Sequence, residues 1–261
     1  MPHAPVHLFS HRFQGTIWNT LAVETENRLV IEVREDVNFK VTFSLLDYAK
    51  GKLIWKDISL PESWWISLAA ANKNTVLLNK FMNKGGNPDR KSLIALDANT
   101  ATIRWEMEEL SFYDWNESEI FGYRTKDDLV QVRINLVTGQ LVEEPWQPKP
   151  ENVKPESPKP VFYAEGTPHF ETVKKFVSQA DYMITKGVEY LEFNDWIIVS
   201  VYVEESAKLA NYLLVFSETG ELVLTLKLGE KLGGLGSDTF FILSGCLFLV
   251  QNKTDLVAYR L

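Results

Sequence analysis

The sequence predicts a single all-β domain over residues 1–261, built from repeated four-stranded units, and three observations support this. The chain contains 8 Trp, 9 Tyr and 15 Phe, and aromatic residues favour the half-buried surface of a β-sheet. A hairpin pattern of two strands around a polar turn recurs four times. A second series of polar turns, each followed by a strongly β run, lies upstream of the hairpins.

The recurring hairpin has an apolar strand that ends at a polar residue, then a short turn, then a second strand. The four copies occupy residues 43–55, 93–105, 131–143 and 212–224. Glycine accepts the positive φ that a tight turn demands. Gly51, Gly139 and Gly220 stand at the same place in three copies. Ala101 takes this place in the remaining copy, which predicts a slightly different turn there.

The upstream turns define five units, each expected to contain four strands. These turns fall at residues 24–28, 72–74, 116–118, 194–195 and 244–245. The last unit runs out of chain after three strands, and the N-terminal segment 7–16 is a spare strand. We expect this segment to join the last blade, which would close a β-propeller and remove an exposed edge. A long gap between the third and fourth hairpins leaves six blades as the alternative to five.

The repeats resemble the quinoprotein-like (PQQ-like) propeller repeat, in which Thr-Gly is followed by Trp four residues after the glycine. The Thr-Gly pairs that end at Gly139 and Gly220 carry the first feature, and Trp55 and Trp105 carry the second. These tryptophans are expected to pack against the neighbouring unit. The resemblance covers most of the chain outside residues 147–186 and implies the fold, but such propellers include dehydrogenases, scaffolds and binding platforms. Quinoprotein dehydrogenases use a vicinal disulfide, which a chain with one cysteine cannot form, so no cofactor is expected.

Residues 147–186 form an insertion between blades 3 and 4. Its first part, 147–160, contains five prolines, which favour an extended, water-exposed linker or a ligand for another domain. Thr167 as a cap and Pro168 at the first helical position then predict one inserted helix, over about 168–182. Two roles are open for this helix: a lid or docking surface at the channel mouth, or a structural element packed on a blade.

Acidic residues outnumber basic ones, at 35 Asp plus Glu against 27 Lys plus Arg, for a formal net charge of −8. This balance repels phosphate groups, so neither nucleic acid nor an anionic membrane is expected as a partner. No secretory signal or apolar run of membrane length is visible, which predicts a cytoplasmic protein. Cys246 stands in an apolar run and is expected to be a small buried hydrophobe.

Three tryptophans at the start of inner strands, Trp18, Trp64 and Trp65, are the candidate ligand-binding residues. Their rings provide a floor for a sugar or another planar ligand. Packing between blades is the structural alternative. The glycine-rich segment 229–238 lacks the end of a phosphate-binding loop and is expected to be a flexible connection.

Asp114 and Glu117 are the candidate catalytic residues, because paired carboxylates beside aromatic rings suit a glycosidase. A polar hairpin turn explains Glu117 equally well. His3, His7 and His11 recur every four residues, but spacing fixes no further donor for a metal, so no metal site is expected.

These patterns predict a non-catalytic binding or scaffold protein that uses the channel face, with a protein, a carbohydrate or another small molecule as its ligand. The alternative is a carbohydrate-active hydrolase with an active site in the central channel. Carboxylates that converge in the channel would distinguish the two, because an enzyme needs them and a scaffold does not.

Overall fold

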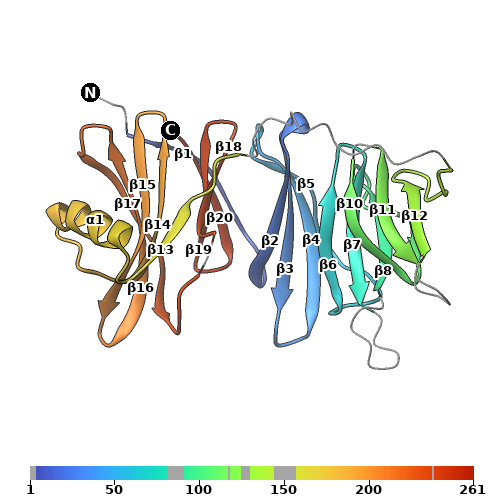
Figure 1. Ribbon diagram of the computed structural model, residues 1–261, viewed down its shortest axis with the longest axis horizontal. Helices are drawn as coiled ribbons and strands as arrows, with labels where there is room; N and C mark the ends of the chain where they lie inside the picture. Colours follow the sequence, from blue (N-terminus) through green and yellow to red (C-terminus); the bar gives the residue numbers. More distant parts are fainter. Residues whose placement is uncertain (1–3, 82–90, 117, 125–129, 144–156, 237) are drawn as a thin grey trace. The chain divides into compact units, whose positions relative to one another are not determined.

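The computed structural model describes residues 4–81, 91–116, 118–124, 130–143, 157–236 and 238–261 (Figure 1). The chain divides into two compact units, residues 14–154 and residues 1–13 with 155–261. Each unit consists of antiparallel sheets whose strands run up and down in order. The predicted all-β architecture of propeller blades is therefore confirmed. The described residues form five sheets, which is the preferred number of blades.

The unit of residues 14–154 contains three sheets. They consist of β2 (Thr16–Val23), β3 (Arg28–Glu35), β4 (Lys40–Asp47) and β5 (Lys52–Ile58); of β6 (Ile66–Ala71), β7 (Thr75–Phe81), β8 (Lys91–Asp97) and β9 (Ile103–Met107); and of β10 (Leu110–Trp115), β11 (Glu119–Arg124) and β12 (Val130–Asn135). Within the described residues, the third sheet has three strands where four are predicted. Beyond β12, an isolated bridge between Ile134 and Leu141 marks the place of the fourth.

The other unit contains two sheets and the helix. The larger sheet consists of β13 (Val161–Ala164), β14 (Ile184–Phe193), β15 (Trp196–Glu205), β16 (Lys208–Ser217) and β17 (Leu222–Leu232), and the smaller of β1 (Val6–Arg12), β20 (Asp255–Arg260), β19 (Cys246–Gln251) and β18 (Phe240–Leu243). Strand β13 is not among the predicted strands, because its four residues lie in the insertion, whose sequence indicates a linker and a helix. Residues 147–156 of that insertion lie outside the described chain.

The N-terminal strand joins the last blade, as predicted. Strand β1 pairs antiparallel with β20 from Val6 opposite Arg260 to Arg12 opposite Asp255, and the last pair is also an ion pair with N–O distance 2.6 Å. The buried Phe13 follows, and its N–H donates to the carbonyl oxygen of Thr254. The strand is shorter than predicted, because Thr16 already begins β2.

The turn at Ala101 has the same form as the turn at Gly139, contrary to our expectation of a slightly different turn. Ala101 has φ 58°, close to φ 64° at Gly51 and φ 72° at Gly139. The N–H of Ala101 donates to the carbonyl oxygen of Asp97, four residues earlier, as that of Gly139 does to Asn135. Alanine therefore adopts the left-handed conformation at an energetic cost that glycine would not carry.

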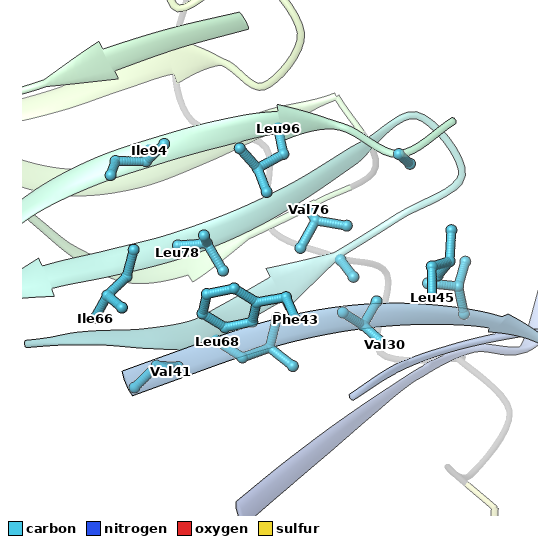
Figure 2. Packing of buried hydrophobic residues seen from close by; sticks show 13 residues of the cluster. Val30, Val41, Phe43, Leu45, Ile66, Leu68, Val76, Leu78, Ile94 and Leu96 are labelled. Carbon is cyan, nitrogen blue, oxygen red and sulfur yellow. The ribbon is translucent and has the colours of Figure 1, made fainter. Parts of the chain in front are cut away.

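The core of the unit of residues 14–154, called the first unit below, lies between its sheets. The unit of residues 1–13 and 155–261 is called the second unit. Figure 2 shows Val30 and Phe43 of the first sheet packed against Ile66 and Leu78 of the second, and all four are buried. Trp55 packs on this cluster, and its indole N–H donates to the carbonyl oxygen of Ala98, in the next sheet, over 2.9 Å. Trp105 repeats this contact one sheet further on, with Leu136 as acceptor at 3.2 Å. The prediction that both tryptophans pack against the neighbouring repeat, which is the next sheet here, is confirmed.

Helix α1 (Pro168–Val177) begins where it is predicted, with the Thr167 hydroxyl accepting a hydrogen bond from the N–H of Phe170. A short 3₁₀ turn, Ser178–Ala180, extends it. Three buried residues at helical spacing, Phe170, Val173 and Val177, pack on the β14–β16 sheet. The same sheet packs its other face on β18–β20. The helix thus covers a sheet face that would otherwise expose Val199, Val201 and other apolar residues.

Candidate functional site

The clearest candidate site is an aromatic strip on the first unit, made of Trp18, Arg34, Phe39 and Trp64. The guanidinium carbon of Arg34 lies 5.3 Å from the ring centre of Trp18 and 5.3 Å from that of Trp64. Phe39 meets Trp64 edge to face at a centroid distance of 5.3 Å. The chain therefore brings two of the three candidate tryptophans together on one cation, an arrangement that cation–π attraction stabilises.

Local backbone features present these rings to solvent. Trp18 stands at a β-bulge, where the pairing of β2 with β3 shifts between Ile17 and Asn19, and bulges re-aim a side chain. Trp18 is 65% exposed and Phe39 is 62% exposed. Phe39 also has φ 48°, a left-handed conformation that is unusual for a bulky residue.

Arg34 is held in place from below by Glu32, two residues earlier on the same face of β3. Glu32 is fully buried, and its Oε1 accepts a hydrogen bond from Arg34 Nε over 2.8 Å. Arg34 Nη2 also donates to the carbonyl oxygen of Ile66 over 2.9 Å. The second carboxylate oxygen of Glu32 accepts the N–H of Leu68 over 2.8 Å. One buried carboxylate thus fixes the cation and joins β3 to the next sheet, and charge-assisted hydrogen bonds of this kind are strong.

The third candidate tryptophan, Trp65, follows Trp64 in the chain and is 49% exposed. The backbone N–H groups of Trp64 and Trp65 both donate to Glu62 Oε1, over 3.0 and 2.9 Å. This carboxylate fixes the chain at the entrance to β6. Glu62 thus holds the backbone of both tryptophans.

Of the two candidate catalytic residues, the structure describes Asp114. Asp114 lies directly after a bulge in β10, and its Oδ1 accepts the N–H of Trp115 over 2.8 Å. Glu117 lies outside the described residues. The nearby Glu119 forms an ion pair with the buried Arg133. The described chain therefore shows Asp114 in a local contact with the backbone of the next residue.

The remaining candidates have local contacts. His7 Nε2 lies 2.8 Å from the hydroxyl of Ser10, and His3 lies outside the described residues. Within the described part of the chain, no three His, Cys, Asp or Glu side chains are grouped as a metal site needs. Cys246 is half-buried, and burial raises the pKa of its thiol. No helix among the described residues is long and apolar enough to cross a membrane.

Sequence reasoning missed a buried polar network in the second unit. Glu189 is buried, and its carboxylate accepts the N–H of Asp238 over 2.6 Å and that of Thr239 over 3.2 Å. Burial raises the pKa of Glu189, and the hydrogen bonds from Thr239 and Asp238 oppose that change. The network holds the end of the glycine-rich segment, and the start of the segment belongs to β17. The signal was present, because Glu32 and Glu189 are each acidic residues inside apolar strand runs.

Comparisons with known proteins give a family for part of the chain only. Residues 22–105 match a domain of unknown function (DUF4905), which is under half of the chain. No curated protein matches the sequence.

Several solved structures are similar to the chain at low identity. BamB from Moraxella catarrhalis is 12% identical, with 98% of this chain and 100% of that one covered and a TM-score of 0.31. The β-propeller domain of the Trilobed protease from Pyrococcus furiosus is 10% identical, with 95% and 79% covered and a TM-score of 0.33. A bifunctional GH43-CE protein of Bacteroides eggerthii is 10% identical, with 95% and 34% covered and a TM-score of 0.29. TM-scores this low do not establish a shared fold, so the architecture rests on the strand pairing described above.

Proposed function

We propose that this chain is a non-catalytic binding protein built on PQQ-like propeller repeats, and that the aromatic strip is its ligand surface. The observation that carries the proposal is the Arg34 guanidinium, which lies over the rings of both Trp18 and Trp64 and is anchored by the buried Glu32. Rigid aromatic and arginine side chains are the residues that dominate binding energy at protein interfaces. Structural packing alone does not need a Trp side chain that is 65% exposed.

The partner is a protein segment with an apolar anchor flanked by basic residues. The strip offers apolar ring surface, and the tip of the β3–β4 hairpin adds Val37, which is 86% exposed. Contiguous exposed apolar surface marks interaction sites. Glu35 and Asp36 precede that tip, and Arg34 is already neutralised by Glu32. Lys40 on the other side of the tip balances one of these two carboxylates, so the surroundings of the strip are acidic on balance, which favours a basic flank on the partner.

A displayed library of random peptides, selected on the immobilised full-length chain, tests this proposal. We expect selected peptides to share a large apolar residue next to Lys or Arg. Trp18→Ala and Phe39→Ala should each weaken such a peptide at least tenfold in a direct binding assay. Tyr113→Ala is the matched control, because Tyr113 is a 50% exposed aromatic residue of the same unit outside the strip.

Two results would overturn the proposal. Selected peptides that bind Trp18→Ala as tightly as the parent chain would remove the strip from the site. Hydrolysis of aryl glycosides that is lost in Asp114→Asn would favour the carbohydrate hydrolase instead.

A further inference from the structure

A groove beside helix α1 lies in the second unit and takes no part in the proposed function. Its cavity volume is about 290 Å³, and its lining includes Tyr163 of β13, Tyr190 of β14, Ile197 of β15, and His169, Thr172 and Phe176 of α1. The three helix residues stand beside the buried residues that hold α1 to the sheet. The α1 groove thus lies between helix α1 and strands β13, β14 and β15.

Three aromatic rings follow one another along the α1 groove. His169 stacks on Tyr163 with a centroid distance of 4.9 Å and an interplanar angle of 27°. Tyr163 lies 6.4 Å from Tyr190 at 38°. The wall is therefore a row of rings, which suits an extended ligand more than a single planar one.

A carboxylate stands at the Tyr190 end of this row. The Tyr190 hydroxyl donates to Glu192 Oε1 over 2.5 Å, and the Glu192 side chain is exposed. The hydrogen bond fixes the carboxylate beside the ring. A ligand with a positive charge at this end would therefore be attracted.

We propose that the α1 groove binds a proline-rich segment of a partner protein, in the polyproline II conformation, with a basic residue beside Glu192. A polyproline II helix advances about 3 Å per residue, so the ring spacings of 4.9 and 6.4 Å each correspond to about two residues of such a helix. A continuous run of prolines can therefore contact all three rings. Aromatic-lined grooves bind such segments because the ligand loses little conformational entropy. Its backbone carbonyls are free to accept hydrogen bonds from the side chains of Tyr163 and His169.

Fluorescence anisotropy with labelled peptides tests the ligand. The probe is a peptide of one lysine followed by six prolines, titrated with the full-length chain. We expect saturable binding, at least tenfold weaker when alanines replace the prolines and several-fold weaker when glutamate replaces the lysine. Absence of saturable binding up to millimolar protein, or equal binding of the alanine peptide, would overturn the proposal.

Variants test the location. His169→Ala removes an exposed ring, so it leaves the fold intact, and it should weaken the proline peptide at least fivefold. Glu192→Gln should keep proline binding and abolish the preference for lysine over glutamate. Phe162→Ala is the matched control, because Phe162 neighbours Tyr163 on the same strand, points to the opposite side of the sheet and does not line the groove. Unchanged binding in His169→Ala, or an equal loss in Phe162→Ala, would place the peptide elsewhere.

Discussion

Replacing Glu32 by glutamine should destabilise the unit of residues 14–154 by about 3 kcal/mol. Removal of one partner from a buried ion pair costs about 3–5 kcal/mol, because the other charge stays behind without compensation. The Glu32 side chain is fully buried and that of Arg34 is 16% exposed. Arg34 also keeps its hydrogen bond to the carbonyl oxygen of Ile66. The remaining cation is therefore partly compensated, and the lower end of the range applies.

A second substitution separates the ion pair from general disruption of the core. Arg34→Leu alone leaves a buried carboxylate with the N–H of Leu68 as its donor. In the double variant, Glu32→Gln with Arg34→Leu, no charge is left unpaired. We expect the double variant to be about 1–2 kcal/mol more stable than the sum of the single effects predicts, since contacting residues do not act additively.

Urea unfolding followed by far-ultraviolet circular dichroism gives these free energies from the midpoint and the slope. Glu35→Gln is the control, because Glu35 is on the same strand and bonds only the exposed Asn38 side chain among the contacts described. It should change stability by less than about 0.5 kcal/mol. A loss below about 1 kcal/mol for Glu32→Gln, or strict additivity in the double variant, would refute the role given to this pair.

Three further predictions follow from the fold. Deletion of residues 1–13 removes β1 and the buried Phe13, so size-exclusion chromatography should show aggregation and urea unfolding a loss above about 3 kcal/mol; a variant as stable as the parent would contradict closure of the last sheet by β1. Ala101→Gly should stabilise by about 0.5–1 kcal/mol, because relief of the left-handed backbone, about 1–2 kcal/mol, exceeds the entropic cost of glycine; a lower urea midpoint would contradict this. Because burial raises the pKa of Glu189, the free energy of unfolding should fall as pH rises from the ordinary glutamate pKa through the raised one, by about 1.4 kcal/mol for each pH unit between these two pKa values. Glu189→Gln should lack this decline, and a parallel decline in both proteins would contradict it.

Strand order and turn positions could be predicted because they depend on local chemistry. The glycines at positions 51, 139 and 220 each have positive φ, as a tight hairpin turn demands. The pairing of the N-terminal strand with the last sheet followed from counting strands, because a three-stranded last sheet leaves an open edge. Thr167 and Pro168 predicted the start of the helix. Threonine can cap a first turn, and proline suits the first helical position because an N–H there would have no partner within the helix.

Other features depend on contacts between distant segments, which the local pattern does not contain. The left-handed turn at Ala101 was missed because alanine rarely adopts it. The stack of Trp18 and Trp64 on Arg34 joins residues of β2 and β3 to the entrance of β6. Strand β13 pairs with β14 across the whole of helix α1, so nothing next to it in sequence predicts its partner.

The two buried glutamates show what a purely apolar interpretation of strand periodicity overlooks. Residues 30, 32 and 34 lie on one face of β3, and Val30 belongs to the core between the first two sheets. Strand β6 is the edge strand of the next sheet, so the backbone N–H of Leu68 in β6 needs an acceptor from outside that sheet. Glu32 on this face of β3 supplies the acceptor. Glu189 does the same for the residues that lead into β18, again an edge strand. Buried backbone donors must be satisfied, and a carboxylate from the preceding sheet does this where no neighbouring strand is present. An acidic residue on the inward face of a strand is therefore a marker of the next blade's first strand, and it could be sought in any chain with these repeats.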